Sequence, residues 1–113
     1  MAKRALGLLK GTLDVLILKA LSWGPLHGYA VSRWIRQVTD DVLDVQEGVL
    51  YPALHRLERR ELVRASWTVS DTNRRVKVYE LTTLGGQQLE SEQHGWNEYS
   101  AAVGKVLGST GPV

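Results

Sequence analysis

The spacing of apolar residues changes twice along this chain, and the order of these changes restricts the fold. Up to Glu61 apolar residues recur with helical spacing, from Leu62 to Leu81 they alternate with polar residues as in strands, and from about Thr83 the helical spacing returns. A chain of 113 residues suits one domain. The pattern therefore predicts a mainly α-helical domain with a two-stranded β-hairpin, followed by a long helix.

Three helices are expected before the hairpin, over residues 12–22, 28–38 and 48–61. Leu9 extends the apolar stripe of the first helix backwards, and the Trp-Gly-Pro segment at 23–25 ends that helix because proline cannot continue it. In the second helix the residues expected to be buried are Tyr29, Ala30, Trp34 and either Ile35 or Val38. Trp23, Trp34 and Trp67 are expected in the core or at its edge, and His27 and Tyr29 are interpreted as packing and turn residues.

The third helix combines one apolar stripe with a polar, basic face. Pro52 is tolerated there because it lies in the first turn, where a missing N–H group has no helical partner. The residues of the apolar stripe are Leu50, Ala53, Leu54 and Leu57, and those of the opposite side are Pro52, His55, Arg56 and Arg59.

The predicted hairpin has a basic tip. Its strands cover residues 62–67 and 76–81, and the Ser-Asp-Thr-Asn sequence at 70–73 is typical of a turn. Arg74 and Arg75 follow this turn directly. In the second strand Arg75, Lys77 and Tyr79 share one face, and Val76, Val78 and Glu80 share the other.

A final helix is predicted over residues 83–107, with Thr82 or Thr83 as its cap. Leu89, Trp96 and Val103 are spaced by seven residues, and Glu92, Tyr99 and Val106 occupy the companion positions of this heptad-like seam. Because nothing follows in the chain to cover the seam, a second copy is the expected partner. The chain thus divides into an N-terminal domain over 1–82, whose first helix is also expected at the dimer interface, a dimerisation helix over 83–107 and a flexible tail over 108–113.

Charge is distributed unevenly along the chain. The 14 Lys and Arg against 12 Asp and Glu give a net charge of only +2. Residues 55–77 nevertheless hold seven basic and three acidic side chains, whereas residues 78–113 hold one basic and four acidic side chains. A basic middle and an acidic end are expected if one surface meets a polyanion and another does not.

Several function classes are excluded by what the sequence lacks. Without cysteine the chain forms no disulfide, thiol nucleophile or cysteine-ligated metal site. The spacing of His27, His55 and His94 is too dispersed for a metal site. No nucleophile–base pair, glycine-rich phosphate loop or paired-carboxylate motif is visible, so we expect neither an enzyme nor a cofactor. No apolar run reaches the roughly 18 residues of a membrane span, and we expect a cytoplasmic protein.

This order of elements is that of a winged helix-turn-helix, in which the third helix enters the major groove and the hairpin contacts the DNA backbone or minor groove. The predicted DNA contacts are Tyr51, His55, Arg56, Arg59, Arg74, Arg75 and Lys77. Alternatives stay open for some of them: the hairpin tip could be an ordinary solvated turn, Tyr51 could lock the helix start, and Arg56 and Arg60 could form surface ion pairs. A protein-interaction module built on the same scaffold is the alternative function, and the basic surfaces favour DNA.

Four motifs resemble the PadR family of bacterial transcriptional regulators. They are LDVLIL at 13–18, PLHGY at 25–29, GVLYPALHRLE at 48–58 and YELTTLG at 79–85, and the resemblance extends over residues 9–107. It implies a homodimer of the short subgroup with one C-terminal dimerisation helix, acting as a repressor at a palindromic operator. The final helix would pair with the partner's first and final helices, through Leu9, Leu13, Leu89, Trp96, Tyr99, Val103 and Val106.

Some short members of that family bind a flat aromatic effector at the dimer interface, and Trp96 occupies the position of the stacking residue. For Trp96 both dimer packing and effector stacking stay open. Two positions depart from the family pattern. Glu61 stands where glycine usually closes the recognition helix, so we expect a different turn there. Val49 stands where a small hydroxyl residue is common, which removes a helix-start hydrogen bond or a phosphate contact.

Overall fold

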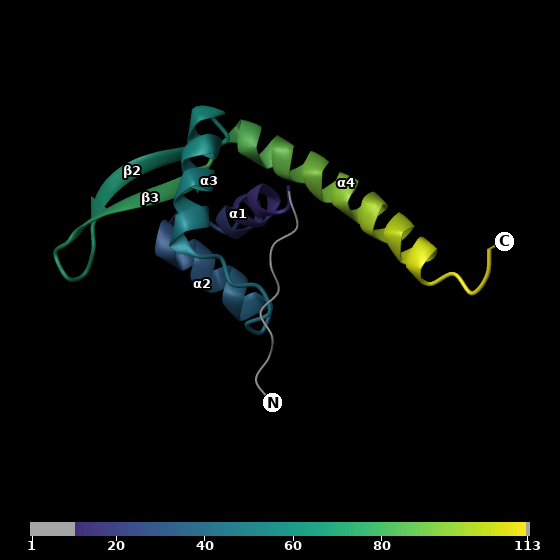
Figure 1. Cartoon of the computed structure of the whole chain (residues 1–113). Coiled ribbons are helices and arrows are strands. Elements are labelled where there is room, and N and C mark those ends of the chain that lie inside the picture. Colours follow the sequence, from purple (N-terminus) through teal and green to yellow (C-terminus); the bar gives the residue numbers. More distant parts are fainter. Residues whose placement is uncertain (1–10, 113) are drawn as a thin grey trace.

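The computed structural model describes residues 11–112, which form four helices and one small antiparallel sheet (Figure 1). In chain order the elements are α1 (Leu13–Leu21), β1 (Leu26–His27), α2 (Gly28–Val38), α3 (Glu47–Arg59), β2 (Val63–Val69), β3 (Arg75–Leu81) and α4 (Thr83–Leu107). The hairpin of β2 and β3 projects from one end of the helical body and α4 leaves from the other. The predicted winged helix-turn-helix with a long C-terminal helix is confirmed.

The three short helices and the base of the hairpin enclose one apolar core. The apolar stripe predicted for α3 is buried at all four positions, and α1 contributes Ile17, Leu18 and Leu21 from its inner face. Leu13 and Leu89 also belong to this core, with only 8% of each residue exposed. Both were predicted at a dimer interface, but both are already buried in the core of this chain, in which α1 and α4 are in contact.

Helix α2 presents a different face to the core from the one predicted. Val31 and Ile35 are buried, whereas Tyr29 and Val38 are exposed, and Trp34 packs against the core from its edge. The prediction that Tyr29 is buried is therefore wrong, and of the two alternatives Ile35 and Val38 it is Ile35 that is buried. A short helix with few apolar residues offers more than one plausible buried face, and its contacts with α1 and α3 decide between them.

The sheet contains a third strand that the sequence analysis missed. β1 pairs with β3, so the strand order is β1-β3-β2 and all pairings are antiparallel. Leu26 lies opposite Tyr79, and His27 lies opposite Val78. Two residues are too few to show a period of two, which explains why β1 left no signal in the sequence.

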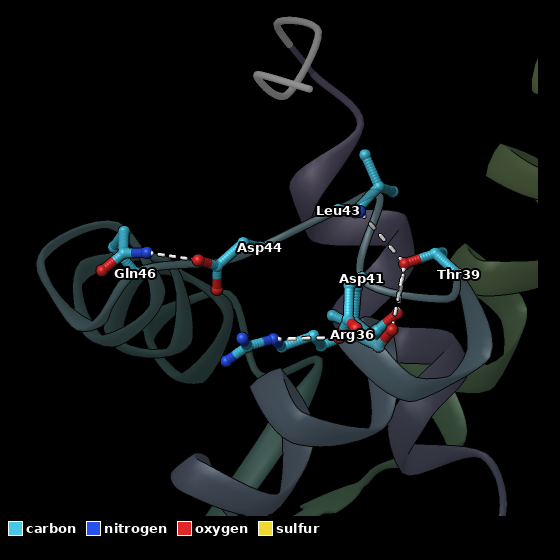
Figure 2. Close-up of polar contacts among 7 residues, drawn as sticks. Arg36, Thr39, Asp41, Leu43, Asp44 and Gln46 are labelled. Carbon is cyan, nitrogen blue, oxygen red and sulfur yellow. Dashed lines mark hydrogen bonds and ion pairs between the residues drawn. The ribbon is translucent and has the colours of Figure 1, made fainter. Parts of the chain in front are cut away.

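Side chains fix the turn between α2 and α3 (Figure 2). The Thr39 hydroxyl donates a hydrogen bond to the Ile35 carbonyl at 2.8 Å and accepts one from the Leu43 N–H at 3.1 Å. Arg36 pairs with Asp41 at 3.2 Å across the same turn. These local bonds set the direction in which α3 leaves α2, and hence the orientation of the exposed face of α3.

The end of α3 is joined closely to the start of α4. The Thr82 N–H donates to the Leu62 carbonyl at 3.1 Å, and the Thr82 hydroxyl donates to the Glu61 carbonyl at 2.7 Å while accepting from the Gly85 N–H at 2.9 Å. Thr82 is thus the cap of α4, as one of the two predicted alternatives. Gly85 packs directly on the Leu62 carbonyl, where a Cβ atom would overlap with the oxygen. We call Leu62, Thr82 and Gly85 the junction.

Glu61 closes α3 in the left-handed conformation, with φ at +61°. The Leu62 N–H donates to the Leu57 carbonyl at 3.0 Å and the Glu61 N–H to the Glu58 carbonyl at 2.9 Å, which is the Schellman pattern. The expectation of a different turn at Glu61 is wrong, because the chain makes the glycine-type turn with glutamate.

Since a left-handed conformation is costly for a residue with a Cβ atom, we expect E61G to raise the free energy of unfolding by about 1 kcal/mol. Thermal melts at one fixed protein concentration should show a midpoint higher by roughly 4 °C. E61A, which removes the carboxylate but keeps Cβ, is the matched control and should melt like the wild type. A melting point of E61G at or below that of E61A would contradict this account.

Helix α4 leaves the body after its first turns. Leu89 is buried against α1, whereas Trp96, Tyr99 and Val106 are exposed further along the helix. The radius of gyration is 16.4 Å, compared with about 13 Å for a compact chain of this length. Among residues 11–112 no helix, α4 included, is both long and apolar enough to cross a membrane.

Candidate nucleic-acid interface

The exposed side of α3 carries two parallel rows of side chains. His55 and Arg59, four residues apart, form the outer row and point away from the body. Arg56 and Arg60, also four residues apart, form the flank row on the side of α1. The outer row has the position from which a recognition helix reaches base edges in the major groove.

The flank row is paired within the chain. Arg56 Nη2 lies 3.0 Å from Asp14 Oδ1, and Arg60 Nη1 lies 3.7 Å from Asp14 Oδ2. The ion-pair alternative therefore describes both arginines in the free chain. Arg56 was also predicted as a DNA contact, and in the free chain its Nη2 atom is already bonded to Asp14.

The wing, which we define as β2, β3 and the turn between them, extends beyond the core. Trp67 lies opposite Lys77 and Val69 opposite Arg75, so these four side chains share the face of the sheet that also carries Tyr79. The Arg75 guanidinium lies 4.7 Å from the centre of the Trp67 ring. Trp67 was expected in the core or at its edge, but 57% of it is exposed because the hairpin carries it past the helices. The same expectation for Trp23 is wrong, because 71% of Trp23 is exposed.

Lys77 bridges the wing and α3. Its Nζ atom lies 3.6 Å from Glu58 Oε1 and 5.5 Å from the centre of the Tyr79 ring. Tyr79 shares the face of Lys77, as predicted, but it is fully buried because this part of β3 covers the core. The same face of β3 is thus buried in the core at Tyr79 and carries an exposed cation at Arg75.

The tip of the wing holds Arg74 outward. Asn73 adopts the left-handed conformation at φ +59°, and its N–H donates to the Ser70 carbonyl at 2.9 Å. The Arg74 N–H donates to the Ser70 hydroxyl at 3.2 Å. Asparagine tolerates this conformation better than most residues, which explains the turn chemistry noted in the sequence.

Three of the predicted contact residues are cations without an ion pair in the part of the chain that the structure describes. Arg59 lies at the exposed end of α3, and Arg74 and Arg75 lie at the wing tip. The other cations of this segment pair with carboxylates: Arg56 and Arg60 with Asp14, Arg64 with Glu80 and Lys77 with Glu58. The structure thereby separates cations available to an anionic ligand from those already neutralised.

An open groove of about 540 Å³ lies between the wing and the first turns of α2 and α3. Tyr29, Tyr51, His55, Trp67 and Lys77 line it together. Hydroxyl, imidazole and ammonium groups all donate hydrogen bonds to phosphate oxygens. The groove joins the outer row to the wing, so it can accept the sugar–phosphate backbone that separates a major groove from the adjacent minor groove.

Tyr51 connects two of the sequence motifs. Its ring lies against Gly28, where a Cβ atom would overlap with the ring. Burial raises the pKa of the Tyr51 hydroxyl, and the nearby Glu47 carboxylate raises it further. The hydroxyl is therefore a neutral donor around pH 7, which suits both of the roles left open for it, a structural one at the start of α3 and a phosphate contact.

Sequence reasoning missed Tyr29 as a candidate contact. It is 57% exposed, and its ring is stacked on that of His27, with the ring centres 6.3 Å apart. His27 also caps α2, because its Nδ1 atom accepts a hydrogen bond from the Ala30 N–H at 3.2 Å. Periodicity gave no sign of this arrangement, in which His27, the last residue of β1, is also the N-cap of α2.

Helix α4, which extends away from the wing, carries the predicted dimer residues Trp96, Tyr99, Val103 and Val106. Trp96 and Tyr99 lie with their ring centres 6.5 Å apart, and Trp96 is 42% exposed. Open grooves of about 440 Å³ and 190 Å³ flank Trp96 where α4 passes α1. Val103 is half-buried and Val106 exposed, whereas Leu9 lies outside the described residues.

Within residues 11–112 no three metal-ligating side chains of the His, Cys, Asp or Glu type come together.

The chain is similar in sequence to a family of regulators and to two curated proteins. A family model described as the transcriptional regulator PadR-like family matches residues 17–91. An uncharacterised protein of Lysinibacillus sphaericus is 33% identical over 97 residues, which cover 85% of this chain and 88% of that protein. An uncharacterised 37.1 kDa protein in a transposon of Streptomyces fradiae is 40% identical over 90 residues, which cover 80% of this chain but only 24% of that protein.

Solved structures with the same arrangement include several bacterial regulators. A transcriptional regulator from Clostridium thermocellum matches with a TM-score of 0.78 and 28% identity, over 85% of this chain and 93% of its own. A PadR-like transcriptional regulator from Bacillus cereus matches with a TM-score of 0.76 and 29% identity, over 88% of this chain and 95% of its own.

Proposed function

Because this chain belongs to the PadR-like family of transcriptional regulators, we propose that it acts as a homodimeric repressor of a palindromic operator. The family consists of DNA-binding winged-helix regulators and not of enzymes. Dimer, direction of regulation and operator symmetry are the finer parts of the proposal, and each has its own support and test.

The observation that carries the DNA contact is the placement of the unpaired cations. Arg59 lies on α3, Arg74 and Arg75 lie at the wing tip, and the groove lies between the wing and α3. In this arrangement α3 would enter a major groove while the wing tip follows the backbone into the neighbouring minor groove. The acidic residues Glu90, Glu92 and Glu98 all belong to α4, which extends away from the wing.

Two features support a homodimer. The exposed apolar side chains of α4 follow a seven-residue spacing beyond the end of the body, and a helix with glycines at 95 and 104 needs packing to be stable. A second copy with its α4 alongside would supply that packing. Two-fold symmetry would then place two copies of α3 on successive turns of DNA, which is the reason for proposing a palindromic operator.

The grooves on both sides of Trp96 support a small aromatic effector. A flat ligand in either groove would contact the indole ring, and the partner's α4 would close the site. Such a ligand would alter DNA binding only by favouring one of two dimer geometries over the other.

The test of the DNA-binding proposal is to titrate a duplex from the region upstream of the gene with the protein. Fluorescence anisotropy at several salt concentrations measures the binding. We expect binding that weakens steeply as salt rises, and tighter binding to the operator than to a random duplex of equal length. Absence of salt-sensitive binding to either duplex would overturn the regulator function and favour a protein-interaction module.

We expect W96A to weaken the dimer or to abolish the response to an aromatic ligand, because it removes the largest side chain of the α4 surface. Sedimentation velocity over a concentration series measures the first effect, and quenching of intrinsic fluorescence by a planar aromatic dye measures the second. W96F, which keeps an aromatic ring, is the control for packing. If W96A sediments and binds like the wild type, Trp96 belongs to neither site.

A further inference from the structure

Asp14, in the first turn of α1, holds two arginines with its two carboxylate oxygens. Its Oδ1 atom accepts a hydrogen bond from Arg56 at 3.0 Å, and Oδ2 lies 3.7 Å from Arg60. The Asp14 side chain is 21% exposed, whereas those of Arg56 and Arg60 are 48% and 50% exposed. One largely covered carboxylate thus draws two half-exposed cations toward α1.

The flank row has a different relation to DNA from the outer row. Arg56 follows His55 by one residue, which is about 100° around the helix. When the outer row faces base edges, side chains on the flank reach the phosphates that border the groove. Arg56 and Arg60 therefore have the position of backbone-contacting cations, yet Asp14 neutralises part of their charge.

Because the two arginine side chains are half-exposed, their pairs with Asp14 contribute little to folding stability. Their larger consequence is for DNA binding, because each cation that contacts a phosphate releases a counterion and strengthens binding regardless of sequence. A carboxylate that occupies two such cations lowers that sequence-independent part of the affinity.

We propose that Asp14 is a specificity-determining residue of the DNA interface, which withholds Arg56 and Arg60 from phosphates and so limits binding to non-operator DNA. The inference rests on the proposed DNA-binding function. On non-operator DNA the protein is free to shift until any unpaired cation meets a phosphate, whereas base contacts fix its position on the operator. Loss of the Asp14 charge therefore strengthens non-operator binding more than operator binding.

The direct test compares D14N with E98Q on a random-sequence duplex. Each change neutralises one carboxylate that contacts a basic side chain, but Glu98 lies on α4, 3.1 Å from His94 and away from α3. For each arginine released, D14N should steepen the dependence of log affinity on log salt by about 0.9, so that affinity falls about 3.5-fold more between 50 and 200 mM salt. E98Q should behave as the wild type. Equal behaviour of D14N and E98Q would overturn the inference.

A second set of variants gives the same answer without changing Asp14. If the two arginines are withheld, R56Q/R60Q should bind the random duplex with nearly the salt dependence of the wild type. A slope smaller by about 1.8 would show that both arginines already contact phosphates and would overturn the inference. In the R56Q/R60Q background, D14N should no longer steepen the salt dependence, and a steeper slope there would also contradict the inference.

The outcomes separate this inference from the proposed function. Salt-sensitive binding of the wild type with an unaltered slope in D14N refutes the role of Asp14 alone. A wild type that binds no duplex refutes DNA binding and the role of Asp14 together.

Discussion

G85A is expected to lower the free energy of unfolding by about 3 kcal/mol, because overpacking against a fixed group is strongly destabilising. The added Cβ atom would overlap with the Leu62 carbonyl oxygen, which belongs to the backbone and accepts a hydrogen bond from the Thr82 N–H. No change of rotamer relieves that overlap. A loss of this size is a large share of the stability of a small domain.

The neighbouring glycine provides the control. A Cβ atom at Gly86 would meet only a Leu81 methyl group, at 3.9 Å, which is ordinary contact. G86A should therefore stabilise the protein by up to about 1 kcal/mol, since alanine is the better helix former. Urea denaturation followed by circular dichroism, at one protein concentration, measures both variants. Equal midpoints for G85A and G86A would show that the junction is not as tightly packed as described.

R74A/R75A is expected to weaken DNA binding about 30-fold at 0.15 M salt and to reduce the salt slope by about 1.8, if each arginine releases one counterion. Both side chains lie at the wing tip without an ion pair in the described part of the chain, so their removal leaves no carboxylate unpaired. The fold should be intact, because neither residue contributes to the core.

The matched control is R36A/R64A, which removes the same charge from arginines that already pair with Asp41 and Glu80. Anisotropy titrations of operator and random duplexes at several salt concentrations measure both double variants. If R74A/R75A loses no more affinity and no more slope than R36A/R64A, the wing tip does not contact DNA.

The elements with strong local signals were predictable from the sequence. The bounds of α2 and α4 agree with the structure, and the apolar stripe of α3 is buried as expected, because helical spacing records which residues face the core. The cap of α4 was predictable as Thr82 or Thr83, because a threonine directly before an amphipathic run is a local feature of the sequence.

Contacts between distant residues could not be predicted in this way. β1 is too short to show a period. The exposure of Tyr29 depends on how α2 packs against α1 and α3, and that of Trp67 on how far the wing extends past the helices. The pairing of Asp14 with Arg56 joins residues 42 positions apart. Periodicity places Arg56 correctly on a polar side of α3, but only the packing of α1 shows that a carboxylate lies beside it.

Glu61 shows the limit of reasoning from residue preference alone. Glycine is favoured at such a position because the conformation is costly for other residues, and the sequence analysis therefore expected another turn. The Schellman hydrogen bonds and the bond from Thr82 to the Glu61 carbonyl outweigh that cost. Tertiary contacts, rather than local preference, determine the turn.

The junction also has a mechanical consequence. Because hydrogen bonds and close packing join the start of α4 to the end of α3, the two helices should rotate together as one rigid body. With 25 residues, α4 is about 37 Å long, so a rotation of about 5° at the junction displaces its far end by about 3 Å. That displacement is close to the rise of one base pair, about 3.4 Å. In the proposed homodimer, angular changes of a few degrees between the two α4 helices would therefore be large enough to move the two α3 helices out of register with DNA.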